Sequence, residues 1–451
     1  MTLFVATLTL FAQVNAFAKS PPHVVFLVAD DLGFGDVGYN GSRIETPNIN
    51  ALAKRGVRLT QFYVQPVCSP TRAALLTGRY PYRYGMQVGV VRPWADYGVP
   101  LEEELLPSLL RSAGYRTFAI GKWHLGHARK EYLPIARGFD HHYGCYNGAI
   151  DYYRHERDGG LDWHRNGDPV REQGYATRLI AKEACRILDE HRPENPLFLY
   201  VPFTAVHTPI QAPKEAQKEY SHFKYRHRQV YAAMTSELDR AVGRIMRQLA
   251  ESNFDPTNTF IVFFSDNGGI PKYGSNGGLR GQKGQVYEGG IRVPAIVVWE
   301  GELEAGKSVE TPLHAVDWFP TVLKVAGVDL PKTEIDGIDL LPMLRHNQSN
   351  PNRVMVHNVT SAHAAIRIGD FKVVHNGHVN AIQAKSDDDT WEVFDIANDP
   401  SEQTNLADQM PIKLTRFKRV VADLRAKSVK PLAKGAKPDD FVVPEVWGNA
   451  D

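Results

Sequence analysis

Most of the chain alternates between apolar runs and amphipathic stretches. The apolar run HVVFLVADDLG (residues 23–33) predicts a buried parallel strand whose carboxyl end carries acidic residues. NINALAKRGVRLTQFYV (48–64) and LPSLLRSAGYRTFAIGKWHLG (106–126) each predict a helix that stops at a glycine and is followed by a strand. Further strands are predicted within residues 197–210, 259–269 and 293–301. A long amphipathic helix is predicted within residues 231–252.

This order of elements predicts an α/β fold with a large mixed, mostly parallel sheet sandwiched by helices. The hydrophobic pattern changes near residue 350. After this point AAIRIGDFKVVH (364–375) and TWEVFDIANDP (390–400) predict short antiparallel strands, followed by a helix from Pro411 to Arg425. We therefore expect an N-terminal domain over residues 19–349 and a smaller C-terminal α+β subdomain over residues 350–451, with an extended tail after Lys430.

The first 18 residues are apolar and uncharged and end in Ala16-Phe17-Ala18, which fits a small-x-small cleavage site. They predict a secretory signal peptide, with a membrane anchor or a buried helix as the alternatives. No later stretch approaches the length of a membrane span, so we expect a secreted, extracytoplasmic protein without a membrane span. Three sequons, at Asn40, Asn347 and Asn358, fit export but are common by chance.

Charge and cysteine content narrow the function classes. The chain has 52 basic and 51 acidic side chains and a net charge of +1, so nothing in its overall charge indicates a nucleic-acid partner. Its three cysteines cannot form a disulfide framework. Cys145 and Cys185 either pair or, as we favour, are two ordinary buried thiols, which leaves Cys68 to be explained.

Acidic and amide side chains stand at the ends of two predicted strands: Asp30 and Asp31 on one, Asp266 and Asn267 on the other. The carboxyl ends of parallel strands are where α/β sheets bind ligands. Four oxygen donors suit a hard cation, and adjacent aspartates repel each other unless a cation lies between them. The alternative for each motif alone is a simple turn, but two such motifs, each ending an apolar strand, favour a metal site.

A set of cationic and imidazole side chains also falls near predicted strand ends, and its members are Arg72, Lys122, His124, His207 and Lys283. Taken singly, each of these residues is more simply explained as a solvated basic side chain or as a histidine of the core. Together with a metal they predict a pocket for a compact tetrahedral anion, sulfate or phosphate. The glycine-dense segment 278–294 suits a loop close to a ligand, and it lacks the Gly-Lys-Ser/Thr of a nucleotide-binding loop.

The segment CSPTRAALLTGR (68–79) resembles the signature of the type I, formylglycine-dependent sulfatases. ADDLGFGDVG, GKWHLG, HTPI, SDNGG and FDIANDPSEQTNLA resemble further blocks of that family, in its order, over roughly residues 23–410. The resemblance implies an alkaline phosphatase-like fold. It also implies that a maturation enzyme oxidises Cys68 to formylglycine (3-oxoalanine), whose hydrate supplies the nucleophilic hydroxyl.

The family's roles carry over to matching positions of this sequence. The implied ligands of Ca²⁺, with Mg²⁺ as the alternative, are Asp30, Asp31, the formylglycine at Cys68, Asp266 and Asn267. Arg72 and Lys122 would fix the hydrate, and Lys122, His207 and Lys283 would bind the sulfate oxygens. His207 or Lys283 would protonate the leaving alcohol, Asp266 would be the base for the attacking hydroxyl, and His124 would take the second hydroxyl's proton as sulfate leaves.

The segment 147–179 is dense in Tyr, Trp, His and Arg and resembles the arylsulfatase B branch, which acts on N-acetylgalactosamine sulfates. Trp94, Tyr152 and Trp163 are candidate sugar contacts, with a place in the core as the alternative. The prediction is a secreted sulfatase acting on a sulfated carbohydrate, either a glycosaminoglycan or another sulfated polysaccharide. Two alternatives stay open: a phosphodiester or phosphonate monoester hydrolase of the same superfamily, and an inactive relative that binds sulfated sugars.

Overall fold

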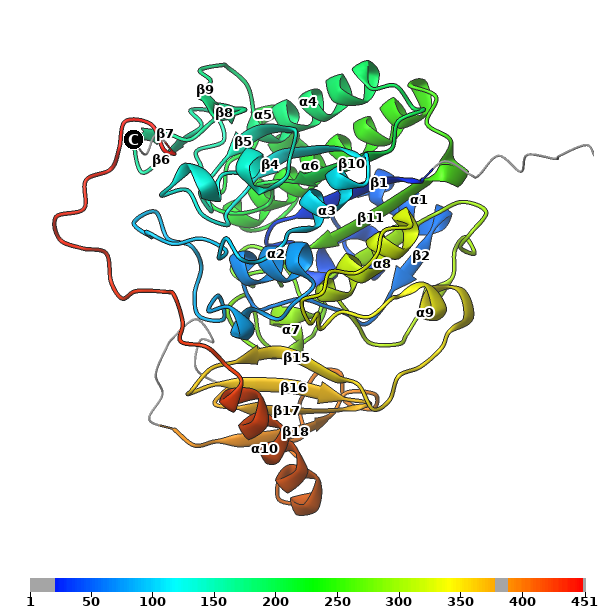
Figure 1. Cartoon of the computed structure of the whole chain (residues 1–451), viewed down its shortest axis with the longest axis vertical. Coiled ribbons are helices and arrows are strands. Elements are labelled where there is room, and N and C mark those ends of the chain that lie inside the picture. Colours follow the sequence, from blue (N-terminus) through cyan, green and yellow to red (C-terminus); the bar gives the residue numbers. More distant parts are fainter. Residues whose placement is uncertain (1–20, 378–387, 449–451) are drawn as a thin grey trace, which may run out of the picture.

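The computed structural model describes residues 21–377 and 388–448, so the predicted signal peptide lies outside the described residues. A large sheet with helices on both faces carries a smaller sheet at one end (Figure 1). Strand β1 (His23–Ala29) runs through the middle of the large sheet. Val25 and Leu27 of β1 pack into one core and Val24 and Phe26 into the other, which is why the strand is apolar at every position after His23.

The large sheet has ten strands, of which β1 and its neighbours β10, β11, β4 and β5 pair in parallel. Antiparallel pairing begins at β12 on one side and at β8 on the other, so the predicted mixed, mostly parallel sheet is confirmed. In spatial order the strands are β13 (Ser308–Val309), β2 (Val57–Leu59), β12 (Ala295–Val298), β11 (Thr259–Ser265), β1, β10 (Leu197–Pro202), β4 (Arg116–Lys122), β5 (His141–Cys145), β8 (His164–Arg165) and β9 (Asp168–Pro169).

Helices cover both faces of this sheet, as predicted. One face packs against α1 (Pro47–Arg55), α4 (Ala176–Glu190) and α6 (Arg226–Glu251), and α5 (Lys214–Glu219) lies against α6. The other face packs against α2 (Cys68–Thr77), α3 (Leu106–Ser112) and α8 (Trp318–Ala326). Besides short 3-10 helices, this domain also contains the short elements β3 (Phe62–Tyr63), β14 (Leu313–His314), β6 (Glu156–Arg157), β7 (Gly160–Leu161), α7 (Glu288–Ile291) and α9 (Leu341–His346).

The C-terminal part forms a four-stranded antiparallel sheet with a helix beside it (Figure 1). Its elements are β15 (Val354–Val359), β16 (Ala364–Ile368), β17 (Phe371–His375), β18 (Trp391–Asp395) and α10 (Pro411–Ala426). After α10 the chain runs back over the large domain, where Val446 bridges Leu161 of β7. The tail predicted after Lys430 is therefore extended, as expected, but it ends against the larger domain.

A buried ionic cluster joins the two parts. Lys372 of β17 lies 3.0 Å from Glu288 of α7 and 2.8 Å from Glu402, and all three side chains are inaccessible or nearly so. Tyr63 donates a hydrogen bond to Glu288 at 2.7 Å. Because each charge is out of water, the cluster is stable only while each member keeps its partner.

Several smaller expectations are settled by the described residues. Cys145 and Cys185 are buried free thiols, as favoured above. The sequon asparagine Asn358 is buried in β15 and is not available to carry a glycan in the folded chain. No helix in the described ranges combines the length and apolar character needed to cross a membrane.

Replacing Lys372 by methionine should lower the free energy of unfolding by about 3–5 kcal/mol, because Glu288 and Glu402 would be left buried without their cation. Denaturant titration followed by circular dichroism measures this. Lys324→Met, on the exposed side of α8, is the matched control and should change stability by less than about 0.5 kcal/mol. Equal stability of the two variants would show that the cluster does not hold the two parts together.

Candidate active site

Strand register brings the predicted acidic residues together. Ala29 of β1 pairs with Ser265 of β11, so the residues that follow, Asp30 and Asp266, leave the sheet side by side. The backbone N–H of Asp266 donates to Ala29 O at 3.0 Å, which extends the ladder to the site itself. The parallel pairing of two apolar strands thus places these carboxylates at one point, as the sequence predicts.

Each of the three carboxylates gives one oxygen to a protein cation. Lys122 Nζ lies 2.6 Å from Asp30 Oδ2, and Lys283 Nζ lies 2.6 Å from Asp31 Oδ1. Arg72 Nε donates to Asp266 Oδ2 at 2.9 Å, and Arg72 Nη2 forms an ion pair with the same oxygen at 2.8 Å. Arg72 also donates to the backbone oxygen of Lys122 at 2.6 Å, which ties the two cations together.

The second oxygen of each carboxylate is buried and accepts no hydrogen bond within the described residues. These atoms are Asp30 Oδ1, Asp31 Oδ2 and Asp266 Oδ1, together with Asn267 Oδ1. Burial, followed by the charge of Asp30, raises the pKa of Asp266 to about 6. Oxygens without partners are costly in a buried site, and an all-oxygen donor set is the one that Ca²⁺ and Mg²⁺ prefer. The residues present therefore fit a hard divalent cation.

Cys68 opens helix α2 next to this cluster and is 1% exposed. Its Sγ and carboxylate oxygens of Asp30 and Asp266 lie within 4.8 Å of one another. Burial raises the pKa of the Cys68 thiol, so the unmodified side chain is poorly suited to act as a thiolate nucleophile. The next residue, Ser69, donates to His124 O at 2.9 Å and accepts from Val91 N at 3.1 Å, which joins three segments of the pocket wall.

His124 is held with one ring nitrogen available. Its Nε2 lies 3.0 Å from Val91 O and therefore carries the proton, which leaves Nδ1, buried and without a partner in the described chain, as an acceptor. Burial, followed by the charges of Lys122 and Arg72, lowers its pKa well below the usual value. His124 also has φ of +61°, a strained conformation that in proteins clusters at functional sites.

His207 lies on the other side of the cluster. Its Nδ1 donates to Thr208 O at 2.6 Å, and its Nε2 lies 3.8 Å from Asp31 Oδ2. Burial and the neighbouring Lys283 lower its pKa to about 3, against the opposing effect of Asp31. Tyr152 donates to Thr204 O at 2.6 Å and lies 2.9 Å from His207 O, so it supports the loop that carries this histidine.

A pocket of about 160 Å³ opens above these groups, and four predicted residues line it: Cys68, His124, His207 and Lys283. Arg72 and Lys122 lie behind the wall, fully buried. Gly148 also lines the pocket, and it has to be glycine because a Cβ there would lie 2.4 Å from the His124 ring. The arrangement is a small cationic pocket above an acidic cluster, which suits an oxyanion bound beside a metal ion.

Two of the predicted sugar contacts require correction. Tyr152 is 1% exposed and Trp163 is fully buried, and both pack in the core between the sheet and helices α4 and α6. Trp163 donates to Glu172 at 2.9 Å and stacks on His155. The tyrosines and tryptophans of segment 147–179 thus include core residues, which was the alternative interpretation. Trp94 is partly exposed and lines hollows beside the pocket.

Two arginines that the sequence did not single out line the pocket, Arg92 and Arg157. Arg157 belongs to the aromatic and arginine-rich segment, whose composition gave a weak signal. Arg92 stands two residues before Trp94, and nothing in its sequence neighbourhood marks it apart from that tryptophan.

An α/β sheet with a cation-lined oxyanion pocket and an acidic cluster at its strand ends describes a class of ester hydrolases, and comparison with known proteins gives the family. The sulfatase family model matches residues 22–328, and the model of the N-sulphoglucosamine sulphohydrolase C-terminal region matches residues 281–434. The chain therefore belongs to the sulfatase family, and the prediction made from its motifs is confirmed. The second match crosses the predicted domain boundary near residue 350, so that boundary stays a prediction.

Curated relatives include arylsulfatase J of Mus musculus, 36% identical over 392 residues that cover 85% of this chain. That alignment spans 65% of the relative's own length. N-acetylgalactosamine-6-sulfatase of Mus musculus is 35% identical over 79% of this chain and 72% of the relative. The crystal structure of Ps i-CgsB, which is also known in complex with k-i-k-neocarrahexaose, has a TM-score of 0.83 and 33% identity, covering 91% of this chain and 94% of that one.

Proposed function

We propose that this protein is a secreted, Ca²⁺-dependent sulfatase that hydrolyses sulfate esters of a sulfated carbohydrate through a formylglycine formed at Cys68. The observation that carries the proposal is the set of four buried oxygens without partners next to Cys68, beneath a pocket lined by His124, His207 and Lys283. The unmodified thiol, with its raised pKa, does not account for this arrangement. An oxygen nucleophile beside a cation does.

In this proposal Asp30, Asp31, Asp266 and Asn267 would hold Ca²⁺, which would supply positive charge, and a formylglycine at residue 68 would supply the nucleophilic oxygen and a further ligand. Lys122 and Lys283, each 2.6 Å from a carboxylate of the cluster, hold positive charge where the sulfate oxygens bind, and His207 stands beside them. Arg72 holds one oxygen of Asp266 and thereby directs the other toward the cluster. Mg²⁺ is the alternative cation.

In this proposal proton transfer falls to side chains of the pocket lining and of the acidic cluster. His124, with its neutral ring and its acceptor nitrogen Nδ1, takes a proton from the residue-68 hydroxyl as sulfate leaves. Lys283 donates a proton to the departing alcohol, or His207 does so after the negative charge of the bound sulfate has raised its pKa and given Nε2 a proton. Asp266 takes the proton of the attacking hydroxyl. The presence of His124, His207 and Lys283 in the pocket lining supports these proposed roles.

The substrate class rests on the pocket and on the relatives. Arg92 and Arg157 line it in addition to the core cations, which suits a substrate with acidic groups beyond the ester that reacts. One relative is named for N-acetylgalactosamine-6-sulfate, and the complex of Ps i-CgsB holds a neocarrahexaose. Both names refer to carbohydrates, and we propose a sulfated glycosaminoglycan or another sulfated polysaccharide or oligosaccharide as the substrate.

Chelation followed by titration tests the metal site without an activity assay. Protein treated with EDTA should bind one Ca²⁺ per chain in a calorimeter and should gain about 2.7 kcal/mol of stability at a Ca²⁺ concentration 100 times Kd. Asp30→Asn, which removes one ligand charge, should weaken binding at least tenfold. The exposed Asp189→Asn should leave it unchanged. Equal binding by both variants, or no binding of Ca²⁺ or Mg²⁺, would contradict the site.

Activity is tested on protein produced together with a formylglycine-generating enzyme. Release of 4-methylumbelliferone from its sulfate should exceed hydrolysis of bis(4-nitrophenyl) phosphate by at least about 100-fold in kcat/KM. His124→Ala should lower sulfate turnover by about 10²–10⁴-fold because it removes a proton acceptor. His222→Ala, on the exposed loop before α6, is the control and should keep full activity.

Two other results would redirect the assignment. Faster hydrolysis of the phosphodiester would favour a phosphodiester or phosphonate monoester hydrolase. Binding of sulfated sugars without turnover, in protein whose formylglycine is confirmed, would favour an inactive sugar-binding relative.

A further inference from the structure

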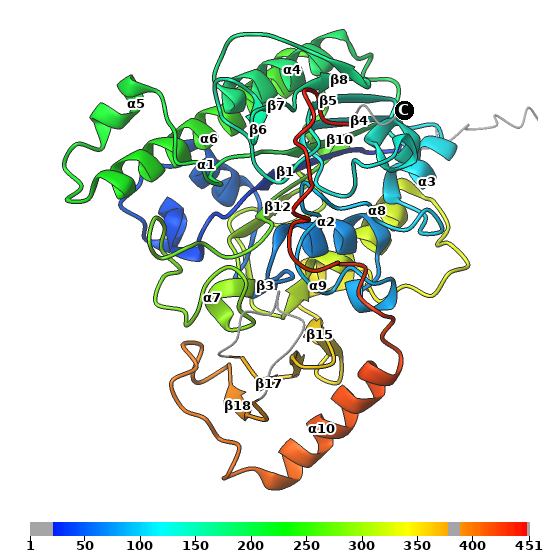
Figure 2. The ribbon, with the colours of Figure 1, turned by 90° about the vertical axis from the view of Figure 1, so that its left-hand side faces the viewer.

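The chain after α10 forms a strap, residues 429–448, that runs across the large domain (Figure 2, red). Hydrogen bonds fix it at both ends: Leu432 N donates to Gly85 O at 2.8 Å, and Trp447 N donates to Leu161 O at 2.9 Å. The indole of Trp447 also donates to the backbone oxygen of Arg157, at 2.9 Å. Because Arg157 lines the catalytic pocket, the far end of the strap is attached to a pocket residue.

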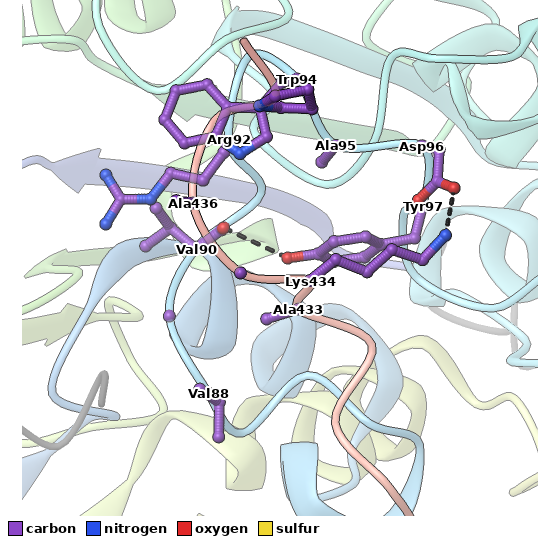
Figure 3. Close-up of a pocket in the computed structure, with 13 residues that line it drawn as sticks. Val88, Val90, Arg92, Trp94, Ala95, Asp96, Tyr97, Ala433, Lys434 and Ala436 are labelled. Atoms are coloured by element: carbon purple, nitrogen blue, oxygen red, sulfur yellow. Dashed lines mark hydrogen bonds and ion pairs between the residues drawn. The ribbon is translucent and has the colours of Figure 1, made fainter. Parts of the chain in front are cut away.

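A groove of about 440 Å³ lies between this strap and the segment 88–97 (Figure 3). Lys434 of the strap forms an ion pair with Asp96 across the groove, and Tyr97 donates to Val90 O at 3.3 Å. Both interactions are drawn in Figure 3. The volume is within the usual range of small-molecule sites, and the ion pair holds the two walls together.

The groove adjoins the catalytic pocket. Val90 and Arg92 line both of them, so a ligand whose ester group lies in the catalytic pocket can continue past Arg92 into the groove. Trp94 separates the groove from a further hollow of about 340 Å³, which is lined by Trp94, Phe441 and Trp447 among others. Segment 88–97 thus forms a continuous wall along three hollows.

The chemistry of the groove suits a charged sugar. Trp94 offers part of its ring, and its indole N–H is buried without a partner among the described residues. Arg92 is exposed and lies 6.0 Å from that ring, and the side chain of Lys434 is 76% exposed. Aromatic faces pack against the apolar faces of sugar rings, and guanidinium and ammonium groups bind sulfate or carboxylate substituents.

Resting on the function proposed above, we propose that the groove between the strap and segment 88–97 binds the sugar units next to the one whose sulfate is cleaved. Trp94 contacts a sugar ring there, Arg92 binds an acidic substituent of it, and Lys434 binds another by exchanging its ion pair with Asp96 for the substrate anion. The C-terminal strap, remote in sequence from the reactive Cys68, is then a specificity element for chain substrates over small sulfate esters.

Comparing substrates of two sizes tests this. The small one is 4-methylumbelliferyl sulfate, and the large ones are k-i-k-neocarrahexaose and a hexasaccharide of 6-sulfated N-acetylgalactosamine. Trp94→Ala should lower the ratio of hexasaccharide to aryl sulfate kcat/KM about tenfold, and Lys434→Met about threefold. Lys437→Met, which removes an equal charge from a strap residue outside the lining of the groove, should keep the wild-type ratio.

A binding measurement keeps the test independent of turnover. In the Cys68→Ala background, the hexasaccharide that wild type cleaves should bind more weakly after Trp94→Ala, by about tenfold in Kd in a calorimeter. Three results would refute the role of the groove while leaving the proposed function intact. They are an equal loss of activity on both substrate sizes, an unchanged ratio of kcat/KM, and cleavage by wild type of the aryl sulfate but of neither hexasaccharide. If modified wild type cleaves no sulfate ester, the proposed function fails, and this inference fails with it.

Discussion

Three aspartates buried at one point of the sheet are the constraint on which the site depends. Asp30, Asp31 and Asp266 would repel one another without compensation, and in each the protein neutralises one oxygen with a lysine or an arginine. The second oxygen of each accepts no hydrogen bond within the described structure. The three cations therefore pair with only half of the carboxylate oxygens, and among the described residues the other oxygens are left as free donors. These free donors distinguish a cation-binding site from a buried salt-bridge network in which every oxygen is paired.

The fold around this point keeps the charges in place. The sheet is buried on both faces, so the central parts of β1 (24–29) and β11 (260–264) carry only apolar side chains before the chain reaches the site. Helix α2 presents Cys68 at its first residue, and Ser69 ties that helix to the segments of His124 and Val91. The small C-terminal sheet is attached through a second buried ionic cluster around Lys372, and the strap returns from it to the mouth of the pocket.

The catalytic centre could be predicted from the sequence because its residues stand at strand ends, where periodicity and polar composition coincide. Asp30 and Asp266 meet because parallel strands align their carboxyl ends, a rule that needs no coordinates. The burial of side chains in segment 147–179 could not be predicted in the same way. Its strands β6 to β9 are each two residues long, which is too short for an alternating pattern to distinguish buried from exposed positions. Tyr152 and Trp163 were therefore candidates both for sugar contacts and for the core, and the structure places them in the core. The return of the strap depends on contacts between residues about 290 apart, such as Trp447 with Arg157, and no local pattern reports such contacts.

The central claim is that residue 68 acts as a formylglycine, and the mass of one tryptic peptide tests it most directly. Trypsin releases Leu59–Arg72, which contains Cys68 and no internal lysine or arginine. In protein from its native host, or made with a formylglycine-generating enzyme, the account predicts the mass of the aldehyde in place of that of the thiol. An unmodified thiol in that peptide, under those conditions, would contradict the account.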